Sequence, residues 1–210
     1  MSLLAETPHQ FAPAEGPTAI TLLLLHGTGG DERDLLPLGR ALHPTAALLS
    51  PRGRVLEQGM PRFFRRFAEG RFDLDDVRVR AGELSALVDE AAVAYDRARD
   101  RFVAVGYSNG ANIAHAMWLL HPDSVAGVVL LHAQFVLAPE PLPRLAGRPA
   151  FLAAGESDPI VPVNEARRLA DLLTSAGATV TAYWSRGGHA LSRDDVTHAR
   201  AWLNSSGFAS

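Results

Sequence analysis

Residues 101–118 read RFVAVGYSNGANIAHAMW, which passes from a buried strand through a bend into an apolar helix. The run 102–105 does not alternate between apolar and polar residues, so it predicts a strand that is covered on both faces. A helix is predicted for 109–121, where a proline follows. Ser108 stands at the bend between two glycines, and G-x-S-x-G in this context predicts a serine hydroxyl that projects above the end of a sheet.

Two interpretations of Ser108 are open at this point. In the first, Gly106 and Gly110 avoid collisions between strand and helix, and the helix N-terminus favours negative charge beside a nucleophilic serine. In the second, the serine caps the following helix at a glycine-rich turn. Since a hydroxyl is a poor nucleophile until a base removes its proton, the first interpretation requires a base elsewhere in the chain.

The bulk composition is that of a globular protein. The chain has 210 residues, of which 47% are hydrophobic and 20% charged, so we expect a single domain over 1–210. The absence of cysteine excludes disulfides and thiolate chemistry, and a net charge of −3 argues against nucleic acid as the main partner. No signal peptide or membrane span is expected, which favours a cytoplasmic protein. A homodimer is left open.

Strands and helices alternate along the chain, which predicts an α/β fold: a mainly parallel sheet between two layers of helices. Residues 1–17 are expected to form a loop or a short edge strand, and 52–76 are expected to be irregular. Strands are expected at 19–25, 46–51, 102–105, 125–131, 149–154 and 178–184, and helices at 31–42, 83–100, 109–121, 164–176 and from Ser192 onward.

His189 is the candidate base. It lies in the loop Arg186-Gly-Gly-His-Ala after the last predicted strand, where two glycines would let the ring turn inward. An exposed loop histidine is the alternative interpretation. His132 follows a strand but is flanked by apolar residues, so it is interpreted as partly buried structure near the site. The remaining histidines lie in predicted helices, at helix ends, in the N-terminal tail or in the loop after the first strand: His9, His26, His43, His115, His121 and His198.

Asp158 is the candidate acid that would orient the base. It ends a predicted strand in Gly155-Glu-Ser-Asp-Pro-Ile-Val-Pro, although an Asp-Pro turn residue is common and Glu156 is a competitor. Ser108, Asp158 and His189 all follow strands of a parallel sheet. Because ligands bind beyond the carboxyl ends of such strands, the three side chains are predicted to meet on one side of the sheet.

Donors for a tetrahedral oxyanion are predicted in His26-Gly-Thr-Gly-Gly, which follows the first long strand. We assign them to the backbone N–H groups of Thr28 and Asn109, with His26 bracing the loop. A simple glycine-rich connection is the alternative. Phosphate binding is disfavoured because neither phosphate-loop pattern is present, and no histidine pair has the spacing of a helical metal site. No cofactor or metal is therefore expected.

The pocket is expected to be open, because only 133–148 separate two strands where related folds insert a cap. Its wall is expected in 52–76, with further contact from the opposite side. The residues assigned to substrate binding are Met60, Phe63, Phe64, Arg65 and Phe135. Phe67 also lies in this segment, and its arginines, Arg62, Arg65, Arg66 and Arg71, could attract an acidic substrate. The alternative is an aromatic patch that packs on the core and leaves its arginines in solvent.

These segments together resemble the carboxylesterase/phospholipase branch of the α/β-hydrolases, which includes acyl-protein thioesterases and lysophospholipases. The similar segments are Leu25-His-Gly-Thr-Gly-Gly-Asp-Glu, Gly106-Tyr-Ser-Asn-Gly-Ala-Asn, Gly155-Glu-Ser-Asp-Pro-Ile-Val-Pro and Gly187-Gly-His. Their order along the chain is the one expected for this fold. The resemblance implies the triad Ser108, Asp158 and His189, with Thr28 and Asn109 as oxyanion donors.

The function expected from these residues is a serine carboxylesterase that hydrolyses small esters or thioesters through an acyl-enzyme. The alternative is a hydrolase-fold protein that binds a small molecule without turnover, and serine chemistry on peptides or lactones is not excluded. The stretch 51–66 resembles a small bacterial subgroup, some of which are linked to quinone or catechol stress. The more distant dienelactone hydrolases use a cysteine nucleophile, which this chain lacks.

Overall fold

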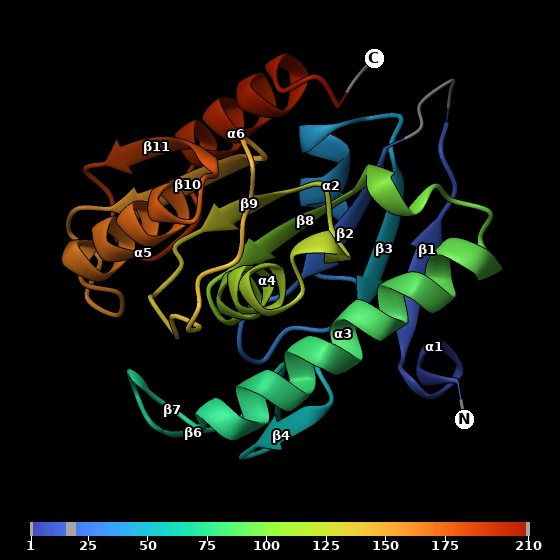
Figure 1. The fold of residues 1–210 in the computed structure, drawn as a ribbon, viewed down its shortest axis with the longest axis horizontal. Helices are drawn as coiled ribbons and strands as arrows, with labels where there is room; N and C mark the ends of the chain where they lie inside the picture. Colours follow the sequence, from blue (N-terminus) through green and yellow to red (C-terminus); the bar gives the residue numbers. More distant parts are fainter. Residues whose placement is uncertain (1, 16–19, 209–210) are drawn as a thin grey trace.

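A seven-stranded sheet forms the centre of the computed structural model, which describes residues 2–15 and 20–208. The strands of this sheet are β1 (His9–Ala12), β2 (Thr21–Leu25), β3 (Ala47–Pro51), β8 (Phe102–Tyr107), β9 (Gly127–Leu131), β10 (Pro149–Gly155) and β11 (Thr179–Ser185). The helices are α1 (Leu3–Glu6), α2 (Leu36–Leu42), α3 (Leu74–Ala94), α4 (Asn109–Leu120), α5 (Val163–Ser175) and α6 (Arg193–Ser205), with short 3-10 turns at Arg99–Arg101 and Pro122–Ser124. Figure 1 shows their arrangement.

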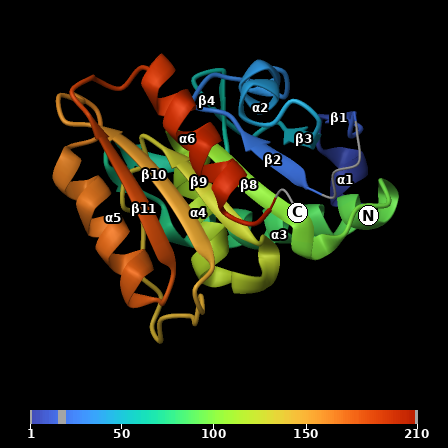
Figure 2. The same cartoon turned by 90° about the horizontal axis from the view of Figure 1, so that it is seen from above.

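The sheet lies between two layers of helices. Its order is β1-β3-β2-β8-β9-β10-β11, and every pairing is parallel except that of the edge strand β1 with β3. Helices α3, α4 and α5 cover one face, and α2 and α6 cover the other (Figure 2). Because both faces are covered, β2, β3 and β9 are buried at every residue, which explains their continuous apolar runs. The predicted three-layer α/β architecture with a mainly parallel sheet is confirmed, and the described residues form no large cap.

The start of the chain supplies the edge strand that the sequence allowed for. Strand β1 pairs with β3 from His9 opposite Pro51 to Ala12 opposite Leu48. Positions 1, 16 and 17 of the expected lead-in lie outside the described residues. So does Ala19, where the next strand was expected to begin.

Two predicted helices have different bounds. The helix expected over 31–42 covers only Leu36–Leu42, because Asp31 forms a turn in which its carboxylate accepts from the N–H of Arg33 at 2.7 Å. The helix expected over 83–100 begins at Leu74 and ends at Ala94. Its start is capped by Asp73, a signal that the apolar periodicity did not include. Among the described residues, no helix is both long and apolar enough to cross a bilayer.

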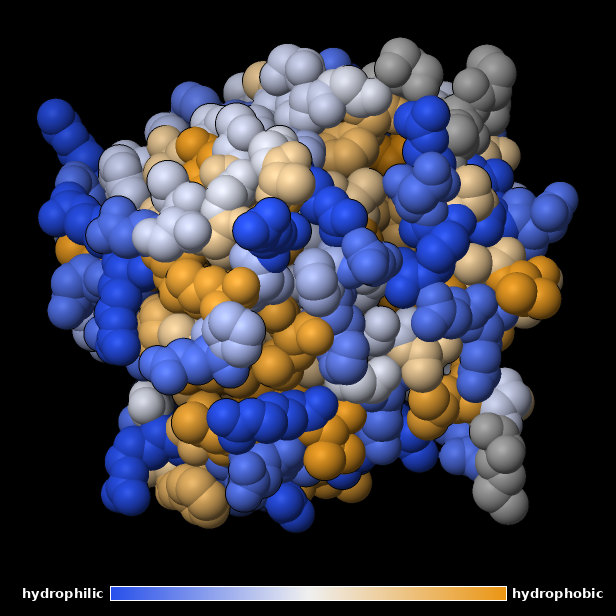
Figure 3. All heavy atoms as spheres, in the orientation of Figure 1, coloured by the Kyte–Doolittle hydropathy of each residue, from blue (hydrophilic) through white to orange (hydrophobic). Residues whose placement is uncertain are grey.

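The segment 52–76 is more regular than expected. It forms two hairpins, β4 (Val55–Glu57) with β5 (Met60–Arg62) and β6 (Arg66–Ala68) with β7 (Arg71–Phe72), and then enters α3. Gly59 and Gly70 turn the hairpins with φ of 81° and 69°, values that favour glycine. The hairpins lie beyond the carboxyl ends of β3 and β8 (Figure 1). On the face of the molecule that Figure 3 shows, polar side chains interrupt the apolar surface.

The fully buried His115 in α4 predicts a loss of stability in mild acid. Its Nε2 lies 3.0 Å from the carbonyl of Gln134, and burial lowers the pKa of its imidazole from 6.5 to about 4. The unfolded chain therefore takes up a proton below pH 6.5 that the folded chain refuses, so stability is full above pH 6.5 and falls as the pH drops toward 4. Between pH 7.5 and pH 5 this group alone should remove about 2 kcal/mol.

The check is urea unfolding of the wild type and His115→Gln at both pH values. The variant should be less stable at pH 7.5, but it should lose less stability between the two pH values than the wild type does. Equal losses in both proteins would assign the pH dependence to other groups, among which His26 and His43 also have a pKa lowered by burial.

Candidate active site

Ser108 occupies a strained turn between β8 and α4. Its φ of 52° is in the left-handed region, which a residue with a side chain adopts only where the surroundings impose it. A Cβ on Gly106 would lie 2.5 Å from the backbone of Gly110 and Ala111, so the turn is closed too tightly for a larger residue. Ser108 stands at the N-cap position, yet its side chain makes no capping hydrogen bond. The capping interpretation is therefore wrong, and the hydroxyl is turned toward the loop after β11.

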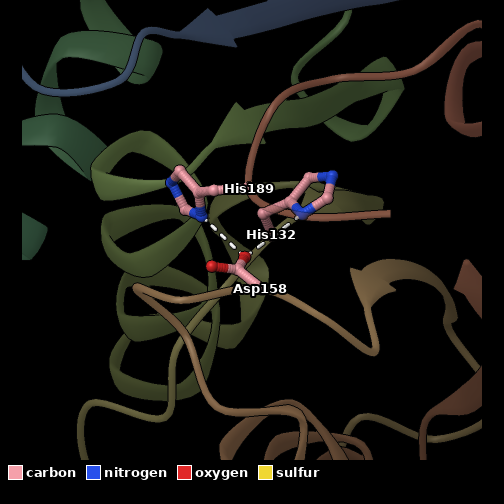
Figure 4. Close-up of side chains that lie close together, drawn as sticks. All are labelled: His132, Asp158 and His189. Atoms are coloured by element: carbon pink, nitrogen blue, oxygen red, sulfur yellow. Dashed lines mark hydrogen bonds and ion pairs between the residues drawn. The ribbon is translucent and has the colours of Figure 1, made fainter. Parts of the chain in front are cut away.

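The structure brings the three predicted triad residues together. Nε2 of His189 lies 2.9 Å from Oγ of Ser108, and Nδ1 of the same ring donates to Oδ2 of Asp158 at 2.7 Å (Figure 4 shows the second contact). Since Asp158 accepts at Nδ1, Nε2 is the nitrogen left to accept the serine proton. The loop histidine is thus half-buried and oriented rather than free in solvent, and Tyr107 steadies it by donating to the carbonyl of His189 at 3.0 Å.

Asp158 serves the turn and the triad with different oxygens. Oδ1 accepts from the N–H groups of Ile160 and Val161 at 2.8 and 2.9 Å, while Oδ2 faces His189. Burial acts to raise the pKa of Asp158, but these hydrogen bonds outweigh it and hold the pKa below its usual range. The carboxylate is therefore charged when it meets the imidazole. The competitor Glu156 points outward to Arg167, at 3.8 Å.

Thr28 and Asn109, whose N–H groups are the predicted oxyanion donors, line the same pocket as Ser108. Within the described part of the chain, neither N–H has a hydrogen-bond acceptor, as an oxyanion hole requires before substrate binds. The loop around Thr28 is held from two sides. Its Oγ1 accepts from Nη1 of Arg62 at 2.6 Å, and the N–H of Gly29 bonds to the carbonyl of Pro61 at 2.9 Å.

His26 braces the same loop, as expected. Its Nδ1 donates to the carbonyl of Gly27 at 2.6 Å, and its Nε2 accepts from the N–H of Gly53 at 2.9 Å. This pattern needs the neutral ring, and burial lowers the pKa of His26 accordingly. The ring thereby ties loop 26–30, the predicted oxyanion loop, to the segment that precedes the first hairpin.

A pocket of about 230 Å³ opens in front of Ser108. Its walls come from the loop after β2, the two hairpins, the start of α4 and the loops that follow β9, β10 and β11. The lining residues are Gly27, Thr28, Arg62, Arg66, Glu69, Phe72, Tyr107, Ser108, Asn109, Asn112, Gln134, Ile160, Val161 and His189. The wall is mixed in character, with two arginines and a carboxylate facing a few apolar side chains.

The residues assigned to substrate binding from the sequence require correction, because none of them lines this pocket. Phe63 and Phe64 are 6% and 0% exposed and pack in the core, Phe63 against His26 and Phe64 against Phe72. The aromatic-patch alternative is the right one for these two.

Met60, Arg65 and Phe135 also lie away from the pocket. Met60 packs near Gly29 on the outer side of the oxyanion loop, and Arg65 pairs with Asp73 at the start of α3. The guanidinium of Arg168 lies 3.8 Å from the ring centroid of Phe135, which lines an adjoining hollow that shares Phe72 and Gln134 with the pocket. Each of the three side chains therefore contacts a neighbour that the sequence did not identify: Gly29, Asp73 or Arg168.

Arg62 and Arg66, two of the arginines expected to attract an acidic substrate, do line the pocket, but they were not in the assigned set, and several other pocket residues were missed. Arg62 is only 2% exposed and is held by Thr28 and by Glu57, whose carboxylate lies 3.1 Å from Nε. Nothing in the local sequence distinguishes it from its exposed neighbours. Asn112 was within reach of prediction, since it lies one helical turn after Ser108 and so shares its face of α4. Its Oδ1 accepts from the N–H of Gln134, which places Gln134 at the pocket.

One group of side chains has the composition of a metal site. His132, Asp158 and His189 each offer a ligand atom, and these atoms lie within 4.8 Å of one another (Figure 4). Two imidazoles and a carboxylate suit a divalent transition metal. However, the contact between Asp158 and His189 is a hydrogen bond of 2.7 Å, and an ion between them would break it. The arrangement fits a proton between these groups better than a metal.

Comparisons with known proteins agree over nearly the whole chain. Residues 9–206 match the phospholipase/carboxylesterase family. A protein of Bacillus subtilis (strain 168) with the name "Putative hydrolase MhqD" is 46% identical over 188 residues, which cover 90% of this chain and 94% of that protein.

Solved structures give the same result. The crystal structure of the Bacillus cereus carboxylesterase superposes with a TM-score of 0.94 at 44% identity, over 96% of this chain and 95% of that one. A structure of YahD with malic acid has a TM-score of 0.89 at 31% identity, over 95% and 99% of the two chains. Sequence and fold thus agree, and the chain belongs to the phospholipase/carboxylesterase family of α/β-hydrolases.

Proposed function

We propose that this protein is a serine carboxylesterase that hydrolyses small esters through an acyl-enzyme. The observation that carries the proposal is the continuous contact from Asp158 through His189 to Ser108, at 2.7 and 2.9 Å. A protein that only binds its ligand has no need of this alignment, nor of a strained serine beside two unpaired N–H groups. The relatives that are named as hydrolases and carboxylesterases support the same reading.

The reaction follows from the positions of the groups. Oγ of Ser108 attacks the ester carbonyl carbon while Nε2 of His189 takes its proton, and the N–H groups of Thr28 and Asn109 hold the oxyanion. His189 then gives the proton to the leaving oxygen, and the carbon–oxygen bond to the alcohol breaks. Water, deprotonated by the same nitrogen, attacks the acyl-enzyme and releases the acid. Asp158 stays ionised and stabilises the imidazolium in both steps.

The substrate proposed for this pocket is short and polar rather than a long acyl chain. Phe63 and Phe64, which were assigned to substrate binding, are in the core, and the wall contains Arg62, Arg66 and Glu69 instead. A volume of about 230 Å³ accommodates a small ester. YahD, the relative whose structure contains malic acid, holds a small polar acid, which supports this class of ligand.

A p-nitrophenyl ester series from acetate to octanoate tests the pocket. We expect kcat/KM to be highest among acetate, propionate and butyrate and to fall with every longer chain, because added methylenes meet charged walls instead of apolar ones. A rate that climbs steadily toward octanoate would contradict the small polar pocket. Absence of turnover on all of these esters and on the matching thioesters would favour the binding-protein alternative.

Covalent labelling tests the nucleophile independently of substrate choice. Phenylmethylsulfonyl fluoride should add a single sulfonyl group with loss of fluoride, and peptide mass mapping should place it on Ser108. The label should appear with the same time course as loss of p-nitrophenyl acetate hydrolysis. Inactivation with the label on another residue would contradict the assignment.

A further inference from the structure

A second histidine–aspartate pair lies behind the triad acid. His132 directly follows β9 and is fully buried, with its ring between two carboxylates. Its Nδ1 lies 3.5 Å from Oδ2 of Asp158, as Figure 4 shows, and its Nε2 lies 3.3 Å from Oδ2 of Asp195 in α6. The side chains of Asp158 and Asp195 are 1% and 0% exposed. Three ionisable groups therefore share a space that is closed to solvent.

Both carboxylates are charged in the folded protein. Burial acts to raise the pKa of Asp195, but hydrogen bonds from His132 and Ser192 outweigh it and hold the pKa below its usual range, as the contacts of Asp158 do for that residue. Asp195 also closes the capping box of α6 with Ser192. Two buried negative charges next to each other are unfavourable unless a cation separates them.

The ring of His132 can supply the cation between these two carboxylates only when both of its nitrogens carry a proton. A neutral imidazole has one donor and one acceptor, so either tautomer would turn a lone pair toward a carboxylate oxygen. The doubly protonated ring donates to Asp195 on one side and on the other side turns its second N–H toward Asp158, with which it forms an ion pair at 3.5 Å. The titratable groups that face the ring are these two carboxylates, the imidazole of His189 and the phenol of Tyr107. The ring centroids of His189 and Tyr107 lie 5.6 and 6.0 Å from that of His132.

The backbone at His132 supports a functional role for this placement. Its φ of 54° is in the left-handed region, where a residue with a side chain is strained. Its N–H bonds to the carbonyl of Ala153 at 2.8 Å, which fixes it against β10. Ser108, at the end of the adjacent strand β8, has nearly the same strained φ of 52°. Strain at the ends of two neighbouring strands thus coincides with the same site.

We propose that His132 is a positioning residue for the triad acid, with its imidazolium anchored by Asp195 and holding Oδ2 of Asp158 in line with Nδ1 of His189. The five residues Asp195, His132, Asp158, His189 and Ser108 then act as one unit, joined by hydrogen bonds and by the ion pair between His132 and Asp158. This inference rests on the proposed esterase function. The cation has a second effect. Because the ring centroids of His132 and His189 are 5.6 Å apart, it also places a positive charge beside the base.

The pH profile of His132→Gln separates this role from a merely structural one. Glutamine can donate to a carboxylate but carries no charge, so His189 should protonate more readily in the variant. We expect kcat/KM for p-nitrophenyl acetate to fall about tenfold or more at its optimum, since a small misplacement near the chemistry is costly. The acidic limb of the kcat/KM profile should move up by about half a pH unit or more.

His115→Gln is the matched control, because it makes the same substitution at another fully buried histidine outside this network. Its acidic limb should coincide with that of the wild type. An unchanged limb in His132→Gln, alongside an active wild type and an inactive Ser108→Ala, would overturn the role of His132 while leaving the esterase proposal intact. Loss of the esterase proposal itself would instead show in an active Ser108→Ala.

A measurement on the wild type does not depend on folding of a variant. In protein with ¹⁵N-labelled histidine, both ring nitrogens of His132 should give the resonances of protonated nitrogens at pH 7. The signals are assigned by their disappearance in His132→Gln, or by their proximity to Asp158 and Asp195 protons if that variant does not fold. One protonated and one unprotonated nitrogen would show a neutral ring and overturn the proposal.

Discussion

Replacement of Ser108 by alanine is expected to lower kcat/KM for p-nitrophenyl acetate by about three powers of ten or more. The hydroxyl oxygen lies 2.9 Å from Nε2 of His189, and no other hydroxyl of the described residues contacts that nitrogen. Without Oγ the acyl-enzyme cannot form, and only the oxyanion donors and the base remain to assist water. The measurement is steady-state hydrolysis at pH 8, with enzyme concentrations high enough to detect the residual rate.

The matched control is Ser175→Ala, which removes an exposed hydroxyl from the last residue of α5. It should hydrolyse the ester at the rate of the wild type. Circular dichroism and the melting temperature of Ser108→Ala should also match the wild type, because its side chain makes no capping bond to α4. A rate in Ser108→Ala within tenfold of the wild type would mean that the nucleophile is another residue.

The triad could be predicted because its residues are marked by local sequence signals. Ser108, Asp158 and His189 each follow a strand and stand beside glycine or proline residues that end it. In a parallel sheet, this position alone brings side chains together at the carboxyl ends, whatever the distance in sequence. The meeting of the three side chains could therefore be predicted without knowledge of the strand order or the register. The same logic located Thr28 and Asn109 at the pocket.

The pocket wall could not be predicted, because residue type does not give direction in a short hairpin. Phe63 packs against His26 and lies at the start of α4, where Oδ1 of Asn109 accepts a hydrogen bond from the N–H of Phe63 at 2.9 Å. Arg62, next to it, turns into the pocket because Thr28 and Glu57 offer it partners. These partners lie on other elements, so the sequence offered the aromatic residues and the arginines of this segment alike and could not say which of them turn into the pocket.

His132 shows the same limit more sharply. Apolar flanks correctly indicated burial, but they gave no sign of the two carboxylates that face its ring. Asp195 reaches it from α6, 63 residues later in the chain. The left-handed φ of His132 could not be predicted from the sequence either, because glycine or asparagine is the residue expected in that conformation. Contacts that join three separate loops and a helix can be read only from the fold.

A second large effect is expected for Gly110→Ala, which should destabilise the fold by about 3 kcal/mol or more. Gly110 lies in the first turn of α4, and a Cβ there would come within 1.9 Å of the carbonyl oxygen of Leu25 and 2.6 Å of that of His26. These are backbone atoms at the end of β2 and cannot rotate away, so α4 has to move. We expect the melting temperature to fall by about 6–12 °C.

The contribution of helix propensity can be separated with Gly82→Ala in α3, the matched helical glycine. Its Cβ would meet only His121, at an ordinary contact distance of 3.6 Å, so the gain in propensity should stabilise the protein by about 0.5–1 kcal/mol. Opposite signs in the two variants, measured by thermal and urea unfolding, would show that close approach of α4 to β2 sets the cost at Gly110.

That approach is also what brings the N–H of Asn109 beside the loop of Thr28. Gly110→Ala should therefore lose activity below its melting temperature as well, and full stability together with full activity would contradict the packing of α4 against β2.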